Sequence, residues 1–431
     1  MGHRPDNAAA LDTPMIAASS IDTHYLATCH DCDLVQQVSH CPVGGIARCA
    51  RCDAKIYTPR HNGIENSLML TLAALCMFVV AVSFPIMSMT IEGQTQEASL
   101  WSAVVGMEEA GMPELAILVF LTAIGIPFLK LAAMIYVLVP VRSGRRPPGL
   151  GWIFRLIGKA GPWAMTEVFL LGLIVAYVKL VDLAQVQLGI ALFAFVAQMF
   201  LMAAADAALD RYSVWALLGP QRRATGVTDV RKLVGCHSCG QVLDLPERPR
   251  RHLVCPRCHA SVHHRKPNSI ARTWALLLTA AILYVPANLY PVMSVIYFGR
   301  GEPDTILSGV VTLVQAGMIP VAALVFFASI TVPLAKLAGL SYLLLSVQRG
   351  WIRRPRDRTR LYRLIEFIGR WSMIDVFMIS ILVALVSLGA IATIEPGIGA
   401  VAFASVVVIT MLASMSFDPR LIWDALETDH G

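Results

Sequence analysis

The chain has 431 residues, of which 56% are hydrophobic and only 15% are charged, and its mean hydropathy is +0.63. Soluble domains carry about 25% charged residues, so the composition excludes an ordinary set of soluble domains and indicates a membrane protein. The net charge of +6 does not by itself indicate a nucleic-acid partner, because the basic residues gather in short loops beside apolar segments. No secretory signal peptide is expected, since the first apolar run begins only near Leu68.

Two cysteine quartets stand out along the chain. The first, after a variable N-terminal tail (residues 1–28), is Cys29, Cys32, Cys49 and Cys52, and the second is Cys236, Cys239, Cys255 and Cys258. Two CxxC turns at this separation supply four thiolates for one tetrahedral metal ion, and soft thiolates favour zinc. We therefore expect two structural zinc ribbons, at residues 29–62 and 236–266, with one Zn²⁺ each. Redox-active dithiols and an iron–sulfur centre are the alternative interpretations.

Eight apolar segments have, or nearly have, the 20 or so residues that span a membrane. Their approximate ranges are 68–89, 115–140, 163–183, 188–209, 271–296, 319–346, 371–393 and 398–416. Arg-rich loops follow the second and sixth segments, whereas the loop after the first has no Lys or Arg. Positive loops face the cytoplasm. We therefore expect both termini and both ribbons on the cytoplasmic side of the membrane.

The chain is an internal repeat with a shift of about 206 residues. The segment Ile126–Ala132 matches Val332–Ala338, and Trp163–Phe169 matches Trp371–Phe377. Each unit has an even number of spans, so the repeat is parallel. The predicted fold is a mainly α polytopic protein with two zinc ribbons, each followed by a four-helix bundle. The expected bundles cover residues 63–212 and 267–418, with a cytoplasmic linker at 213–235 and a C-terminal tail at 419–431.

Ionisable residues inside spans are costly and mark candidate functional sites. Lys336 and Asp375 lie in consecutive antiparallel segments, and the first half repeats them as Lys130 and Glu167. A proton or polar-substrate relay and a structural ion pair both fit these residues, and the second half adds hydroxyls that fit interhelical hydrogen bonding as well. The remaining polar candidates are Lys179, Asp182, Ser329, Ser372 and Thr410, with Asn288 between two prolines of the fifth segment.

The repeated combination of ribbon and four helices, with the strings Pro286–Val292, Asp304–Gly309 and Trp371–Phe377, resembles the paraquat-inducible protein A family. The resemblance implies an inner-membrane partner of periplasmic MCE-domain proteins, which moves lipids between inner and outer membranes. It implies that the second half handles lipid. It also assigns a polar network to seven positions: Lys179, Asp182, Ser329, Lys336, Ser372, Asp375 and Thr410.

Three functions follow as hypotheses. The first is a lipid-transport subunit working with an MCE-domain partner, membrane lipids and no nucleic acid. The others are a membrane adaptor that anchors that partner, and a cytoplasmic redox or zinc sensor. An enzyme is not expected, because the sequence shows no nucleophile–base arrangement, and the histidines gather near the ribbons and the termini.

Overall fold

The computed structural model describes residues 26–37, 42, 44–91, 94–145, 147, 149–181, 185–219, 233–244, 253–297, 300–386 and 392–428. Within these ranges, eight helical segments are long and apolar enough to cross a membrane, as the sequence predicts. They are Gly63–Ser83, Pro113–Arg142, Leu150–Val181, Ile190–Ala208, Ser269–Leu289, Ile319–Gln348, Pro355–Leu385 and Ile398–Ser416. The predicted fold class, mainly helical with two tandem repeats and two four-cysteine groups, is confirmed.

The first bundle comprises the helices α1 to α7. Its spans are α1 (Gly63–Ser83), α3 (Pro113–Val119) continued by a π-helical turn into α4 (Ile126–Arg142), α5 (Leu150–Ala160) continued into α6 (Thr166–Val181), and α7 (Ile190–Ala208). The second bundle repeats them as α9 (Ser269–Leu289), α11 (Ile319–Phe326) with α12 (Val332–Gln348), α13 (Pro355–Ile368) with α14 (Ile374–Leu385), and α15 (Ile398–Ser416). Short helices α2 (Leu100–Glu109) and α10 (Ile306–Gln315) precede the second span of each bundle.

Several span boundaries differ from the expected ones for identifiable reasons. The third and seventh spans begin earlier, because α5 and α13 are helical although their basic residues suggested loops. Both are strongly amphipathic, and each buries one face: α5 buries Leu150, Phe154 and Ile157, and α13 buries Tyr362 and Ile365 together with Arg358. The first and fifth spans end earlier, at Ser83 and Leu289, just before the Pro85 and Pro291 that interrupt the helical hydrogen-bond pattern.

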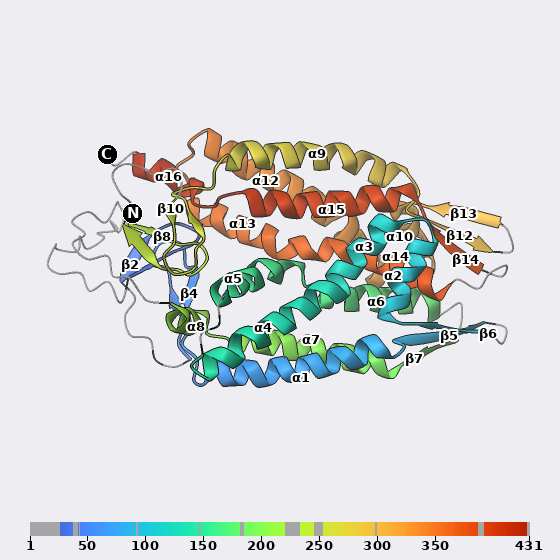
Figure 1. The fold of residues 1–431 in the computed structure, drawn as a ribbon. Helices are drawn as coiled ribbons and strands as arrows, with labels where there is room; N and C mark the ends of the chain where they lie inside the picture. The colour runs from blue at the N-terminus through green and yellow to red at the C-terminus, as the bar shows by residue number, and fades with distance from the viewer. Residues whose placement is uncertain are drawn as a thin grey trace, which may run out of the picture.

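A small three-stranded sheet follows each of these early helix ends, and the sequence analysis missed both. One has the order β6–β5–β7, with β5 (Met87–Ile91) between β6 (Gln94–Ala98) and β7 (Gln185–Leu188). The other has the order β13–β12–β14, with β12 (Met293–Tyr297) between β13 (Arg300–Asp304) and β14 (Ala392–Pro396). All pairs are antiparallel, and both sheets lie at the end of the molecule opposite the ribbons (Figure 1).

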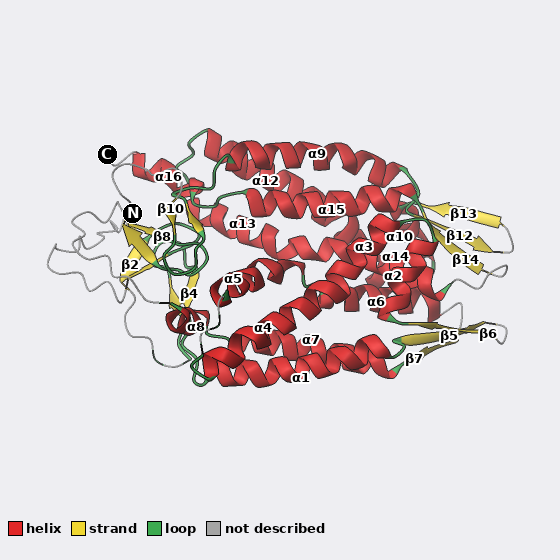
Figure 2. Ribbon diagram, in the orientation of Figure 1, coloured by secondary structure: helices red, strands yellow, loops and turns green. Residues whose placement is uncertain are grey.

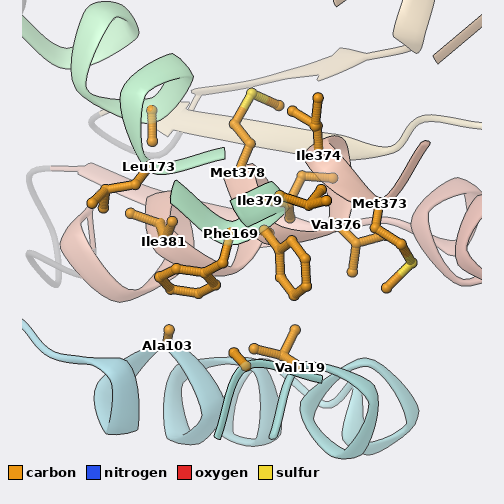
Figure 3. Packing of buried hydrophobic residues seen from close by; sticks show 14 of the residues in the cluster. Ala103, Val119, Phe169, Leu173, Met373, Ile374, Val376, Met378, Ile379 and Ile381 are labelled. Atoms are coloured by element: carbon orange, nitrogen blue, oxygen red, sulfur yellow. The ribbon is translucent and has the colours of Figure 1, made fainter. Parts of the chain in front are cut away.

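The two bundles meet along α6 and α14. Every residue of α14 is buried, and the rings of Phe169 and Phe377 lie 5.3 Å apart across this contact. A Cβ at Gly172 would come within 2.9 Å of the Phe377 Cβ, so glycine permits this close approach. In Figure 3, Ile379 and Ile381 of α14 lie near Phe169 of α6. Ala103 of α2 and Val119 of α3 face this core from the opposite side.

Each ribbon is built from two short antiparallel hairpins. The first ribbon has β1 (Leu26–Thr28) paired with β2 (Val35–Gln37), and β3 (Ala47–Arg48) paired with β4 (Lys55–Tyr57). The second has β8 (Leu233–Gly235) paired with β9 (Val242–Asp244), and β10 (Leu253–Val254) paired with β11 (Ser261–Val262). Both ribbons lie at one end of the helices (Figure 2).

The ribbons are exchanged between the bundles in space. The cysteines of the first ribbon share a buried cluster with Leu277, Leu340 and Tyr362 of the second bundle. The cysteines of the second ribbon share one with Leu68 and Phe154 of the first bundle. Thus each ribbon precedes one bundle in sequence but packs its metal-site side against the other.

Short helices after each bundle complete this exchange. Helix α8 (Arg211–Leu218) begins at the end of the expected first bundle and continues into the expected linker, and α16 (Leu421–Thr428) lies in the expected C-terminal tail. The Arg257 side chain of the second ribbon donates to the Trp215 carbonyl of α8 at 2.8 Å. The Arg51 guanidinium of the first ribbon lies 4.7 Å from the Trp423 ring of α16. Equivalent arginines therefore contact equivalent tryptophans in the repeat.

Candidate metal centres and intramembrane polar site

Each cysteine quartet forms a compact buried cluster. The four Sγ atoms of each quartet lie within 4.8 Å of one another, and the shortest separations are 3.4 Å for Cys29–Cys52 and 3.5 Å for Cys236–Cys258. In a tetrahedral site with metal–sulfur bonds of 2.3 Å, sulfur atoms are roughly 3.8 Å apart. The residues present therefore fit one tetrahedral metal ion per ribbon.

The backbone of each CxxC turn is arranged to aim its thiols at one point. The amide of each leading cysteine donates to a carbonyl five residues ahead, as from Cys29 to Leu34 at 3.0 Å. The residue after each second cysteine has positive φ, and its amide returns to the first cysteine. These four residues are Asp33, Asp53, Gly240 and His259. The same tight turn thus occurs four times, which is why the spacing alone locates the cluster.

The first ribbon is held by a charged residue of the second bundle. The Arg363 Nε of α13 donates to the Asp31 carboxylate at 2.7 Å, and its Nη2 donates to the Cys52 carbonyl at 3.1 Å. The same Nη2 lies 3.3 Å from the Cys52 Sγ. The guanidinium therefore supports the thiolate cluster and fixes the ribbon on the bundle.

Lys336 is buried in the second bundle and bonds to two neighbours. Its Nζ donates to the Gly369 carbonyl at 2.7 Å and to the Thr410 hydroxyl at 3.3 Å. Gly369 begins the 3₁₀ turn that joins α13 to α14, where helical hydrogen bonding is interrupted. The lysine therefore satisfies a carbonyl at a broken helix, as the membrane interior requires.

Asp375, the second residue of α14, is the least satisfied group of the site. It is 4% exposed, and its carboxylate oxygens have no hydrogen-bond partner among the described residues. Asp375 of α14 and Lys179 of α6 line the same narrow cavity of about 30 Å³, whose wall also includes residues of β12, α10 and α11. Lys179 comes from the first bundle, so this polar site joins the two halves.

Some sequence-predicted pairings are wrong. Lys336 forms no ion pair with Asp375 in the described structure, because it turns towards Gly369 and Thr410. Lys130 pairs with Asp206 of α7 rather than with Glu167, which is exposed. Sequence spacing indicates the depth of each expected partner in the membrane, but it does not indicate which neighbouring helix its side chain faces.

The other sequence candidates are distributed as follows. The hydroxyl of Ser329 donates to the Val325 carbonyl at 2.7 Å, and the buried hydroxyl of Ser372 lacks a partner in the described structure. The Asn288 amide donates to the Tyr284 carbonyl at 2.8 Å within α9, so its contact is local. Asp182 lies outside the described residues.

Two acidic residues were missed by the sequence analysis. Asp206 is ionisable within the fourth span, and that rarity alone was a usable signal. Asp304 ends β13, where its carboxylate accepts a hydrogen bond from Ser308 at 3.1 Å and acts electrostatically on Lys179. Nothing in the sequence shows that Asp304 and Lys179 approach, because they belong to different bundles.

Comparison with known proteins identifies the family of this chain. A family model described as paraquat-inducible protein A matches residues 64–219 and 270–427, once in each bundle. The chain belongs to this family. It is 34% identical over 413 residues to the intermembrane transport protein PqiA of Escherichia coli, covering 93% of this chain and 96% of that protein.

Two further relatives have related names. The lipophilic envelope-spanning tunnel protein A of Escherichia coli is 33% identical over 402 residues, with 93% of this chain and 91% of that protein covered. A probable intermembrane transport protein of Haemophilus influenzae is 29% identical over 378 residues, with 88% and 90% covered. No solved structure matches the chain. Family membership and the eight spans together make the chain a multi-pass membrane protein with a transport role.

Proposed function

We propose that this family member is a lipid-transport subunit of the bacterial inner membrane. It works with a periplasmic MCE-domain protein to move lipids between the inner and outer membranes, and it is not an enzyme. The observation that carries the proposal is Asp375, which is buried where the two bundles meet, lines a cavity with Lys179 and has no hydrogen bond to any residue that the structure describes. Membrane proteins reserve such costly groups for transport or gating, and the relatives' names agree with transport.

The mechanism follows from the electrostatics of this junction. An ionised carboxylate in an apolar interior is strongly destabilised until it is protonated or paired. Asp375 changes its protonation or pairing during the cycle, and α14 shifts against α6 as that penalty is relieved. Lys336 anchors the turn before the moving segment through the Gly369 carbonyl, and it ties that turn to α15 through Thr410. Ser329, Ser372 and Lys179, together with Asp182, supply the remaining polar positions of this network.

The ribbons have a structural part in this proposal. Each quartet holds one Zn²⁺, which would supply folding energy and no chemistry, since four protein ligands leave no open position. Both ribbons and both termini face the cytoplasm, where thiols remain reduced. Ribbon exchange then links the two bundles at this end, so relative motion is concentrated at the sheet end.

Replacement of Asp375 by Asn tests the transport role. The matched control is Glu167→Gln, because Glu167 is the repeat equivalent but is exposed. At equal protein levels, Asp375→Asn is expected to reproduce the envelope-lipid defect of a deletion strain, and Glu167→Gln to behave as wild type. Full activity of Asp375→Asn contradicts the assigned role.

Outcomes elsewhere separate the other hypotheses. If all intramembrane polar substitutions are harmless while changes on the ribbon surface abolish function, the chain is an adaptor that anchors the MCE protein. If mild oxidant releases zinc and alters function reversibly, it is a redox sensor. The transport proposal expects copurification of an MCE-domain protein and stoichiometric zinc that withstands mild oxidant.

A further inference from the structure

A second cavity, distinct from the narrow one at Asp375, lies between the bundles at the sheet end. Its volume is about 250 Å³, and both halves of the chain line it. Its walls are mainly apolar, formed by residues such as Met89, Leu180, Met293, Leu313, Leu382 and Ile394. Pockets that bury a whole drug-sized ligand measure about 300–1,000 Å³. A cavity of this size therefore takes part of an amphiphile, such as a headgroup with the beginning of its chains.

Two residues of opposite charge are part of this mainly apolar lining. Lys179 comes from α6 of the first bundle, and Asp304 comes from the end of β13 in the second. Asp304 acts electrostatically on Lys179, but the described structure contains no ion pair between them within 4.0 Å. Lys179 also lines the inner cavity with Asp375. The cavity therefore offers a cation and an anion that are held apart.

We propose that this cavity binds the phosphoethanolamine headgroup of a phospholipid, with the phosphate at Lys179 and the ammonium at Asp304. This inference rests on the proposed lipid-transport function and names the lipid class. A lysine is a suitable partner for a phosphate, and a carboxylate accepts charge-assisted hydrogen bonds from a primary ammonium group. The apolar residues contact the glycerol and the first methylene groups of the acyl chains.

The same chemistry disfavours other common headgroups. Phosphatidylglycerol has no ammonium group, so its binding would leave the Asp304 carboxylate with the hydrogen bond from Ser308 but without a cation. The quaternary ammonium of phosphatidylcholine has no N–H donor and is usually recognised by aromatic cages. No aromatic side chain is among the described residues that line this cavity. The expected order of affinity is therefore phosphatidylethanolamine above phosphatidylcholine and phosphatidylglycerol.

The test uses the purified full-length chain in detergent and measures the affinity of short-chain phosphatidylethanolamine, phosphatidylcholine and phosphatidylglycerol. Wild type is expected to prefer phosphatidylethanolamine. Asp304→Asn keeps an oxygen that accepts from Ser308, and it is expected to remove about tenfold of that preference. Lys179→Met is expected to weaken both phosphatidylethanolamine and phosphatidylglycerol. Thr279→Val removes a threonine hydroxyl from α9, outside this lining, and is the matched control.

Asp304→Glu distinguishes chemistry from folding, because it restores the charge and is expected to recover most of the preference. Free phosphoethanolamine, used as a competitor, is expected to bind far more weakly than the short-chain lipid if the apolar walls contribute. Equal affinity for the three lipids, or an unchanged preference in Asp304→Asn, overturns the headgroup assignment. If transport still requires Asp375 in that case, the proposed function stands; if no lipid binds and none is transported, both fail.

Discussion

The contact between Arg363 and the first ribbon gives a quantitative prediction. Arg363→Gln removes the 2.7 Å bond to Asp31 and the 3.1 Å bond to the Cys52 carbonyl. Exposed ion pairs contribute about 0–1 kcal/mol, whereas removing one member of a buried pair costs about 3–5 kcal/mol. The Arg363 side chain is 32% exposed and that of Asp31 is 9% exposed. An intermediate cost of about 2 kcal/mol follows, which is roughly a 30-fold change in the docking equilibrium of the ribbon.

The assay is the rate of cysteine alkylation in the full-length zinc-loaded chain, resolved by mass spectrometry for each quartet. Arg363→Gln is expected to accelerate labelling of Cys29 and Cys52 about tenfold or more, while the second quartet reacts as in wild type. The matched control is Arg155→Gln, because Arg155 is the repeat equivalent but has no hydrogen bond or ion pair with a described residue. Equal acceleration in both quartets, or the same effect from Arg155→Gln, refutes docking of the first ribbon on the second bundle.

Three further predictions concern stability. Gly172→Ala places a Cβ 2.9 Å from the Phe377 Cβ, so it should lower the free energy of unfolding by about 1–3 kcal/mol. Gly161→Ala is the control, because a Cβ there meets no atom within 4 Å, and equal denaturation midpoints for the two variants contradict the prediction. Asp206→Ala leaves the buried Lys130 without its carboxylate partner and should lower the free energy of unfolding, and adding Lys130→Met should restore it. If the double variant loses as much stability as the two single variants together, the two residues do not interact. Burial alone would raise the pKa of Asp418, but bonds from the Arg420 guanidinium and the Lys266 amide lower the pKa to about 2. Because the folded pKa lies below the unfolded one, this stabilisation of about 2 kcal/mol is present above pH 4 and is lost as pH falls towards 2. The stability difference between wild type and Asp418→Asn in denaturant should therefore shrink on acidification, and a constant difference contradicts the assignment.

Local and periodic features of the sequence predict much of this fold. Four CxxC turns carry their own geometry, and apolar runs of sufficient length leave few alternatives to spanning helices. The repeat then predicts two equivalent bundles. These features depend on neighbouring residues in the chain, so the sequence alone reveals them.

Features that depend on long-range packing were not predictable in the same way. The exchange of ribbons depends on which ribbon Arg363 and Trp423 contact, and the sequence around these two residues does not indicate it. The helices α5 and α13 were interpreted as loops because their arginines obscured an amphipathic pattern. Lys130 pairs with Asp206 rather than with Glu167 because of the rotation of the helices about their axes. Asp304 and Lys179 line one cavity only because the two bundles pack together. Sequence analysis therefore identified many of the polar residues but not their partners.

The proposed movement of lipids between the two membranes is tested most directly by measuring the rate of phospholipid transfer. In cells whose only member of this family is the present chain, newly synthesised phospholipid is pulse-labelled and its appearance in the opposite membrane is timed. The account predicts slower transfer on depletion of the chain and with Asp375→Asn, and a normal rate with Glu167→Gln. An unchanged transfer rate after complete depletion would contradict it.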